Sequence, residues 1–380
     1  MVKIVTIIGA RPQIIKAAAL SRAIRENFSS EINEIIVHTG QHYDHNMSDV
    51  FIEEMRIPQP NYNLGIGSAS HGEQTAEMIK GVEIILQKEQ PQWCVLFGDT
   101  NSTLAGAVAA AKMHIPVAHI EAGLRSFNKS MPEELNRIAC DHFSTLLFAP
   151  TTTAVHNLKN EGFNTDASPP FHIDNPGIIH SGDIMYDNTL FFNSIAQQKT
   201  DIIQKLQLEN KKFALCTIHR PYNTDNDSRL KSIFQAFIDL SLETELDFII
   251  PLHPRTAKIL KSLNDKTFVG KLEASKGVKI IEPVSFIEIT ALESHAQLIL
   301  TDSGGVQKEA YFMKKPCVIL RSETEWVEIV EHKAGVLTDA DSHQIKQAVN
   351  QFMQNPPQDF PHVFGDGKAA EKICQWLIGE

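Results

Sequence analysis

The sequence predicts an α/β protein built from two doubly wound, Rossmann-like domains that face a cleft. Its 380 residues are too many for one ordinary hydrophobic core, since a domain takes roughly 150 residues. Short β-branched runs alternate with longer helical segments from end to end, an order typical of βαβ units. The short runs show little polar alternation, which indicates parallel strands covered by helices on both faces.

The apolar runs predict six strands in each half of the chain. In the first half they are Val2–Ile8, Glu34–His38, Trp93–Phe97, Val117–Glu121, Leu146–Ala149 and Ile178–Ser181. In the second half they are Phe213–Thr217, Asp247–Leu252, Val278–Ile281, Leu298–Thr301, Pro316–Leu320 and Gly335–Leu337. Helical segments between them include Ile14–Asn27, His71–Gln87, Thr103–Met113 and Arg229–Leu242. A boundary is expected near Asp183–Asn193, which gives an N-terminal domain over 1–185 and a C-terminal domain over 186–364.

Composition excludes several classes of protein. The formal net charge of −11 leaves no excess of Lys and Arg to neutralise a nucleic-acid backbone. The five cysteines are odd in number, scattered and without a CxxC pair, which favours a reducing compartment and predicts small core residues. The apolar run at the start is short and leads directly into Gly9, and no stretch is long enough to span a bilayer. We therefore expect a soluble, cytoplasmic protein without membrane or nucleic-acid partners.

The turn after the first strand carries positive charge. It reads Gly9-Ala-Arg11-Pro12-Gln-Ile-Ile-Lys16, a glycine turn followed by proline at an expected first helical position. Free N–H groups at a helix N-terminus bind anions, and Arg11 and Lys16 add charge there. The alternative is a surface Arg and Lys on an ordinary helix.

Three carboxylates follow strands or begin a helix in the first half: Asp99, Glu121 and Glu133. Carboxylates at the ends of elements in one domain are typical of acid/base chemistry. Each has a structural alternative. Asp99 could cap a helix, Glu121 could pair with Arg125 or Arg137, and Glu133 could complement a helix dipole.

The second half offers residues suited to a nucleotide. His219 follows a strand and could donate to a phosphate or protonate a leaving group, although a lone histidine is more often held by backbone. Ser303, Gly304 and Gly305 lie between a strand and a helix, an arrangement typical of a phosphate-binding turn. Glu309 lies about one turn further, where a carboxylate could accept from a ribose diol. The segment ending at Phe286 could offer backbone groups to a uracil edge.

Taken in order, these segments resemble the non-hydrolysing UDP-N-acetylglucosamine 2-epimerase family. The matching stretches are Gly9-Ala-Arg-Pro…Lys16, Gly98-Asp-Thr, His119-Ile-Glu-Ala-Gly-Leu-Arg125, Pro132-Glu-Glu-Leu-Asn-Arg137, His219-Arg220, Thr301-Asp-Ser-Gly-Gly-Val-Gln-Lys-Glu309 and Gly365-Asp-Gly367. The resemblance implies a glycosyltransferase-B architecture, with the last segment, 365–380, crossing back to the first domain. It also implies a UDP-sugar substrate, a homodimer, and no metal or other cofactor.

The resemblance also implies roles. Asp99, Glu121 and Glu133 match the positions tied to proton transfer at C2 of the sugar, and His219 matches the residue assisting the leaving phosphate. Arg11 and Lys16 match positions that stabilise the negative charge near the leaving phosphate. The residues matching positions that hold UDP are Ser303, Gly304, Gly305 and Glu309. The implied reaction interconverts UDP-GlcNAc and UDP-ManNAc by elimination of UDP to a glycal and its re-addition.

Two departures from the familiar pattern favour a related substrate. Gln13 stands where Glu is familiar, and Gln41–Met47 replaces a Gln-His-Arg form associated with regulation by a second substrate molecule. Both stretches resemble the branch acting on UDP-2,3-diacetamido-2,3-dideoxy-glucuronate. Other readings remain open: a hydrolysing 2-epimerase releasing ManNAc and UDP, a glycosyltransferase on the same scaffold, or a non-enzymatic UDP-sugar-binding regulator.

Overall fold

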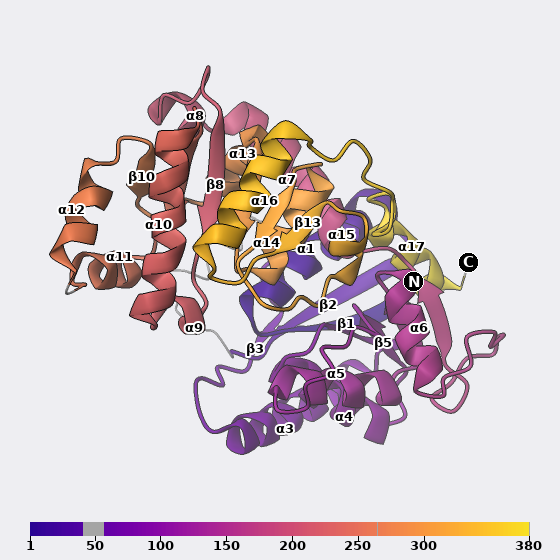
Figure 1. Ribbon diagram of the computed structural model, residues 1–380. Helices are drawn as coiled ribbons and strands as arrows, with labels where there is room; N and C mark the ends of the chain where they lie inside the picture. Colours follow the sequence, from indigo (N-terminus) through magenta and orange to yellow (C-terminus); the bar gives the residue numbers. More distant parts are fainter. Residues whose placement is uncertain (41–56, 264, 380) are drawn as a thin grey trace. The chain divides into compact units, whose positions relative to one another are not determined.

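The chain divides into two compact units in a computed structural model that describes residues 1–40, 57–263 and 265–379 (Figure 1). Unit 1 comprises Met1–Asn188 and His362–Glu380, and unit 2 comprises Thr189–Pro361. The C-terminal segment therefore returns to the unit in which the chain begins. The departure noted at Gln41–Met47 lies outside the described residues.

Unit 1 is built on a seven-stranded parallel sheet with the order β3-β2-β1-β4-β5-β6-β7. Its strands are β1 (Val2–Ile8), β2 (Ile32–His38), β3 (Tyr62–Asn63), β4 (Trp93–Phe97), β5 (Val117–Ile120), β6 (Leu146–Ala149) and β7 (Gly177–His180). Its helices are α1 (Arg11–Asn27), α3 (His71–Glu89), α4 (Asn101–Lys112), α5 (Pro132–Phe143), α6 (Thr152–Asn160) and α17 (Ala369–Ile378). Helix α7 (Ile184–Lys199) begins in unit 1 and continues into unit 2.

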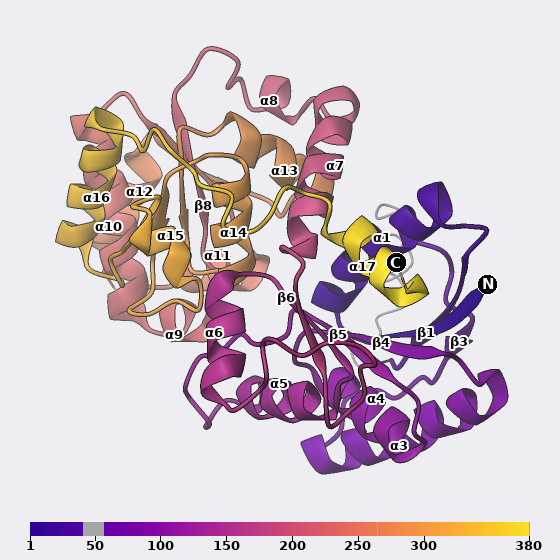
Figure 2. The ribbon, with the colours of Figure 1, turned by 90° about the vertical axis from the view of Figure 1, so that its right-hand side faces the viewer.

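Helices cover both faces of the unit 1 sheet, with α1 and α17 on one face and α3, α4 and α5 on the other (Figure 2). On the second face, Val5 and Ile7 of β1 pack in one core with Val82 of α3 and Ala107 of α4. Strands buried on both sides need apolar side chains at every position, which explains the unbroken runs in the sequence.

Helix α17 is attached to unit 1 by polar contacts. The Asp187 carboxylate accepts from the backbone N–H groups of Ala369 (3.1 Å) and Ala370 (2.8 Å), at the first turn of α17. The indole of Trp93 donates to the carbonyl of Leu377 (3.1 Å) near the helix end. Both termini of the helix are thus held by residues far away in the sequence.

Unit 2 is built on a six-stranded parallel sheet with the order β10-β9-β8-β11-β12-β13. Its strands are β8 (Phe213–Thr217), β9 (Asp247–Pro251), β10 (Val278–Ile281), β11 (Leu298–Thr301), β12 (Cys317–Ile319) and β13 (Gly335–Leu337). Its helices are α8 (Ile202–Lys205), α9 (Pro221–Thr224), α10 (Asp227–Glu243), α11 (Pro254–Lys261), α12 (Lys266–Ala274), α13 (Phe286–His295), α14 (Gly304–Phe312), α15 (Val327–Glu331) and α16 (Ser342–Gln354).

Alternate residues of β8 face the two cores of unit 2. Ala214 and Cys216 belong to the core formed with α10 and α16. Phe213 and Leu215 belong to the core formed with α13 and α14. This alternation follows from the pleat of a strand, whose successive side chains point to opposite faces.

The predicted fold class and all twelve predicted strands are confirmed, with ends that differ by up to two residues. The sequence reading missed β3, which has two residues. It also began α4 too late, because Thr100 is the N-cap and accepts from the backbone N–H of Thr103. A helix cap of this kind is made by polar residues, so the pattern of apolar residues does not predict it.

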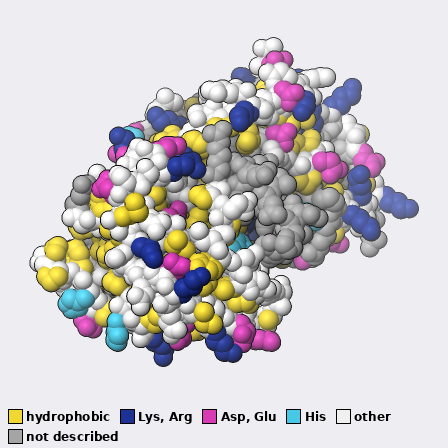
Figure 3. Space-filling view, turned by 180° about the vertical axis from the view of Figure 1, so that it is seen from behind, with side chains coloured by type: hydrophobic (Ala, Val, Ile, Leu, Met, Phe, Trp, Pro, Cys, Tyr) yellow, Lys and Arg dark blue, Asp and Glu magenta, His cyan; other side chains and the backbone are white. Residues whose placement is uncertain are grey.

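Several other predictions concern the surface and the cysteines. All five cysteines are buried with free thiols, as expected for core residues. Within the described chain, no helix is both long and apolar enough to cross a bilayer. On the face drawn in Figure 3, Lys and Arg side chains lie among Asp, Glu, polar and hydrophobic ones.

Candidate active site

The edge of the unit 1 sheet where the winding reverses lies between β1 and β4. In open α/β sheets this is where ligands bind, beyond the carboxyl ends of the strands. Gln13, which is almost fully buried, joins the two turns at this point. Its side-chain oxygen accepts from the Ala10 N–H (3.0 Å), and its amide donates to the Phe97 carbonyl (3.2 Å). An ionised Glu has no hydrogen to donate to Phe97, so the amide suits this position.

Two of the three predicted carboxylates lie together at this edge, each paired with a cation. Glu121 is bonded to Lys16 across a buried ion pair. Asp99 is 2.6 Å from Nη2 of Arg137, and the same Nη2 lies 4.0 Å from Oε2 of Glu121. Arg137 therefore stands between the two carboxylates. The side chain of Asp99 is 27% exposed and that of Glu121 is 7% exposed, so Asp99 is the more accessible acid.

The backbone at these carboxylates has an uncommon conformation. Glu121 has a φ of 72°, in the left-handed region that few non-glycine residues adopt. Gly98 also has a positive φ, and a Cβ atom there would lie 3.2 Å from both the Glu121 carboxylate and the Lys16 ammonium. Strained backbone of this kind persists where surrounding contacts hold it, often at functional sites. A side chain at position 98 would therefore contact the Lys16–Glu121 pair.

Glu133 and Arg11 are solvent-exposed at the first turns of α5 and α1. The neighbouring Glu134 is buried instead, and its carboxylate accepts from the N–H groups of Ser126 (2.8 Å) and Phe127 (3.0 Å). Of the two adjacent glutamates, Glu134 therefore holds the loop before α5. Glu133 is left open to solvent and makes no hydrogen bond or ion pair within the described chain.

A buried polar network lies behind the carboxylates. His119 and Asp141 are both 0% exposed, and their side chains are joined at 2.7 Å. The other oxygen of Asp141 accepts from Arg125 (2.7 Å) and the Gly123 N–H (3.1 Å). Burial alone would raise the pKa of Asp141, but the hydrogen bond from His119 and the charge of Arg125 outweigh it and lower that pKa. Asp141 is therefore a buried carboxylate ion.

The alternative partners considered for Glu121 are resolved by these contacts. Arg125 pairs with Asp141 and, through two nitrogens, with Glu161 at 2.7 and 2.6 Å. The suggested pairing of Arg125 with Glu121 is therefore wrong. Arg137 does approach Glu121, although its shorter contact is with Asp99.

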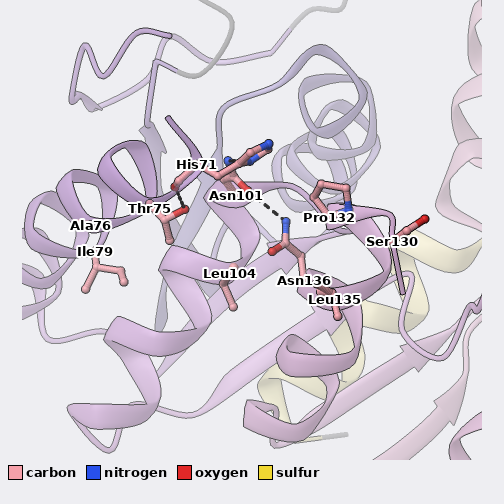
Figure 4. Close-up of a pocket in the computed structure, with 11 residues that line it drawn as sticks. His71, Thr75, Ala76, Ile79, Asn101, Leu104, Ser130, Pro132, Leu135 and Asn136 are labelled. Carbon is pink, nitrogen blue, oxygen red and sulfur yellow. Dashed lines mark hydrogen bonds between the residues drawn. The ribbon is translucent and has the colours of Figure 1, made fainter. Parts of the chain in front are cut away.

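A surface pocket of about 560 Å³ lies between α3, α4 and α5 (Figure 4). Its wall includes Asn101 and Asn136, whose side chains are hydrogen-bonded to each other at 3.2 Å. The same Asn136 amide donates to the backbone carbonyl of Asp99 (3.0 Å). The pocket thus lies behind the turn that presents Asp99, and the acid side chains do not line it.

In unit 2 the winding reverses between β8 and β11, and a fully buried aspartate lies there. Asp302 accepts from the backbone N–H groups of His219 (3.0 Å) and Arg220 (3.1 Å), and from the Asn223 amide (3.1 Å). It also contacts Nδ1 of His219 at 3.1 Å. Burial would raise the pKa of Asp302, but the bonds from His219 and Asn223 lower it overall.

These contacts orient the His219 ring. Nδ1 faces Asp302, while the side chain as a whole is 55% exposed. Nε2 is therefore the nitrogen left for a ligand. A carboxylate behind an exposed imidazole fixes the orientation of the ring.

The turn after β11 begins α14 with free backbone N–H groups. Ser303 is the N-cap and accepts from the Val306 N–H. A Cβ atom on Gly304 would lie 2.3 Å from the Glu325 carboxylate, so a larger residue there would have to displace the Glu325 side chain. Gly305 is exposed, and a Cβ atom on it would meet only the Ser303 hydroxyl, at 3.8 Å. The helix N-terminus is thus accessible to an anion on the Gly305 side.

Glu309, one turn into α14, has a carboxyl neighbour on α13. Glu293 is 1% exposed, and burial together with the charge and hydrogen bond of Glu309 raises its pKa well above the ordinary value. A protonated Glu293 therefore donates to Glu309. Phe286, at the start of α13, packs edge-on against Phe192 with ring centroids 5.1 Å apart.

Sequence patterns did not reveal the contacts that Asp141, Glu293 and Asp302 make with the candidate residues or their supports, although they offered Arg137 as one of two partners for Glu121. Asp302 had a signal, since it directly follows a strand and precedes a Ser-Gly-Gly turn. Asp141 and Glu293 had none, because they lie within helices among ordinary polar residues. No group of three or more His, Cys, Asp or Glu in the described part of the chain is arranged to hold a metal ion.

Comparison with known proteins supports one family. The UDP-N-acetylglucosamine 2-epimerase family matches residues 24–378. The chain is 47% identical over 377 residues to a UDP-N-acetylglucosamine 2-epimerase homolog of Methanococcus maripaludis, covering 99% of both chains. It is 46% identical over 375 residues to the UDP-2,3-diacetamido-2,3-dideoxy-D-glucuronate 2-epimerase of Pseudomonas aeruginosa, again covering 99% of both.

A solved structure agrees with these relatives. The chain resembles the UDP-GlcNAc 2-epimerase of Methanocaldococcus jannaschii, crystallised with UDP-GlcNAc and UDP, with a TM-score of 0.81 and 42% identity over 99% of both chains. Matches this extensive show common descent along the whole chain. The protein is therefore an isomerase-type enzyme that belongs to the UDP-N-acetylglucosamine 2-epimerase family.

Proposed function

We propose that the enzyme interconverts UDP-GlcNAc and UDP-ManNAc by inverting C2 of the sugar. A carboxylate takes the C2 proton, the C1–O bond breaks with its electron pair leaving on UDP, and a C1=C2 double bond forms. Return of a proton to the other face of C2 and of UDP to C1 completes the inversion. The observation that carries the proposal is the pair of cation-matched carboxylates, Asp99 and Glu121, in a chain of this family.

In this proposal unit 1 supplies the proton transfers. Asp99, Glu121 and Glu133 are the acids and bases. The buried Lys16 is the ion-pair partner of Glu121, and the exposed Arg11 adds positive charge at the start of α1. C2 is not next to a carbonyl, so removal of its proton has to be coupled to departure of UDP. General acid–base catalysis contributes about 10²–10⁴-fold in rate.

Unit 2 supplies the UDP-binding groups. The N-terminus of α14, with Ser303, Gly304 and Gly305, suits the diphosphate, and Glu309 suits the ribose diol. The backbone near Phe286 is proposed for the uracil. His219, oriented by Asp302, would stabilise the departing diphosphate, whose charge grows as the C1–O bond breaks.

A second substrate is favoured by one comparison. The Pseudomonas aeruginosa relative, which acts on UDP-2,3-diacetamido-2,3-dideoxy-D-glucuronate, is 46% identical to this chain. The Methanocaldococcus jannaschii UDP-N-acetylglucosamine 2-epimerase is 42% identical. The doubly acetamidated, carboxylated sugar is therefore the alternative that an assay must include.

Deuterium uptake tests both substrates. The enzyme is incubated in heavy water with UDP-GlcNAc or with the diacetamido-glucuronate nucleotide, without an acceptor, and the products are analysed by NMR and mass spectrometry. Deuterium at C2 and a product still linked to UDP are expected. Free ManNAc would indicate a hydrolysing enzyme instead. Absence of exchange with both nucleotides would exclude the proposed reaction.

We further propose that the enzyme is a homodimer in the cytoplasm. Five free, buried cysteines are consistent with a reducing compartment. Helices α3 and α5 leave Ile84 (66%) and Leu135 (51%) exposed, and Leu135 borders the pocket of Figure 4. Sedimentation at micromolar concentration would distinguish a dimer from a monomer.

A further inference from the structure

We infer that His119 is a positioning residue that holds the turn presenting Asp99 by donating a hydrogen bond from Nε2 to the carbonyl oxygen of Gly98. This inference rests on the proposed function, because it assigns Asp99 to proton transfer. His119 itself is fully buried and reaches no substrate. Its effect would be exerted through the backbone.

The contacts of the His119 ring run in two directions. Nδ1 lies 2.7 Å from Oδ1 of Asp141, on α5, and Nε2 lies 2.7 Å from the carbonyl oxygen of Gly98. Both neighbours are acceptors. Each ring nitrogen must therefore carry a hydrogen for both contacts to be hydrogen bonds. The ring then links β5 and α5 to the turn after β4.

Charge within the network agrees with a ring that carries both hydrogens. The side chains joined to it through Asp141 are Arg125 and Glu161. With His119 positive, the two cations and the two carboxylates sum to zero. Without that charge, the network would carry a net charge of −1, divided between the fully buried Asp141 and the Glu161 side chain, which is 28% exposed.

The position of the Gly98 carbonyl affects the position of the Asp99 side chain. Gly98 immediately precedes Asp99, and a Cβ atom on Gly98 would already lie 3.2 Å from Glu121 and from Lys16. A shift of this turn therefore changes the position of Asp99 relative to Glu121. Displacement of a reacting group by about 1 Å can reduce turnover by about 10²-fold.

Two substitutions separate the two hydrogen bonds. In His119→Asn, the side-chain amide replaces Nδ1 and can still donate to Asp141, but nothing reaches Gly98. In His119→Gln, the amide replaces Nε2 and can still donate to Gly98, while Asp141 keeps Arg125 and the Gly123 N–H. The two variants thus form a matched pair.

The test measures C2 deuterium exchange, UDP affinity and melting temperature for both variants. We expect His119→Asn to lose about tenfold or more in kcat, with UDP affinity unchanged, and His119→Gln to recover most of that loss. Equal turnover in the two variants, or slower turnover in His119→Gln, would overturn the inference. Wild-type enzyme that exchanges no deuterium would instead refute the proposed function.

A measurement on the wild type covers the case in which neither variant folds. Nitrogen-15 NMR of the histidine-labelled enzyme, at the pH of the assay, reports which ring nitrogens carry hydrogen. A buried ring with hydrogen on both nitrogens is expected for His119. Finding no hydrogen on Nε2 would overturn the inference, because that nitrogen could not donate to Gly98.

Discussion

Asp99 in unit 1 and Asp302 in unit 2 occupy equivalent places in two sheets of the same winding. Each follows the strand beside the point of reversal, and each directly precedes a helix N-cap, Thr100 or Ser303. Their surroundings differ. Asp99 is 27% exposed and pairs with one guanidinium, whereas Asp302 is 0% exposed and accepts from three backbone and side-chain N–H groups around His219.

The difference shows that position in the fold does not set the role of a carboxylate. The Asp302 carboxylate accepts hydrogen bonds from the turn that carries His219, so its role is to stabilise that turn. Asp99 keeps an accessible side chain and is available for proton transfer. In each unit the neighbouring strand is followed by an Arg-Pro pair at the start of a helix, Arg11-Pro12 after β1 and Arg220-Pro221 after β8. The same winding thus surrounds the two carboxylates with different partners.

The largest effect is expected from removing the acids of unit 1. Asp99→Asn and Glu133→Gln should each lower turnover by about 10²-fold or more, because an amide cannot accept the C2 proton. UDP affinity and the melting temperature should stay close to wild type, since both side chains are at least partly exposed. Steady-state kinetics and calorimetry measure these quantities.

Glu134→Gln is the matched control for Glu133→Gln. Glu134 is the buried neighbour that holds Ser126 and Phe127, so its substitution should lower stability more than turnover. Turnover retained in both Asp99→Asn and Glu133→Gln would show that these are the wrong acids. Asp99 and Asp302 would then differ in burial and partners but not in a role in proton transfer.

Asp302→Asn tests the other side of the comparison. Replacing one carboxylate oxygen by an amide NH2 turns a donor toward existing N–H donors, and we expect a loss of about 2–3 kcal/mol in unfolding free energy. Turnover should also fall, as in His219→Ala, because the imidazole loses its orientation. Denaturant unfolding and kcat measure the two effects. A stable variant with normal kinetics would show that Asp302 does not organise this turn.

The smallest effect on turnover is expected for Glu293→Gln, whose effect on stability should depend on pH. Burial beside Glu309 raises the pKa of Glu293 above its ordinary 4.5, so the folded protein binds more protons than the unfolded chain above that pH. The contribution of Glu293 to the free energy of unfolding of the wild type therefore falls as the pH rises from about 4.5 towards the raised pKa. The fall is about 1.4 kcal/mol for each pH unit in that interval.

Glutamine mimics the protonated acid, so Glu293→Gln should be similar to wild type in stability at pH 4.5 and more stable at pH 8. Thermal unfolding across that range, with the exposed Glu282→Gln as control, measures the difference. A constant difference between variant and wild type at all pH values would contradict a raised pKa. UDP affinity measured alongside would show whether this acid also supports Glu309.

Most of the fold could be predicted because buried parallel strands need unbroken apolar runs, and the chain displays twelve of them. The two-residue strand β3 was missed since Tyr62–Asn63 is too short to form a pattern. The candidate acids could also be predicted, because carboxylates after apolar strands stand out from their neighbours. Which of those acids are paired, and with what, could not.

The sequence by itself determined the two parallel sheets, the turns at their carboxyl ends, and the candidate residues that those turns carry. These features are local, since each depends on a run of residues and the one that follows it. Only the tertiary structure decided that Arg137 stands between Asp99 and Glu121 and that Asp302 lies behind His219. Such pairs join residues far apart in the chain, and the free energy of a buried charge depends on the neighbours that folding brings to it.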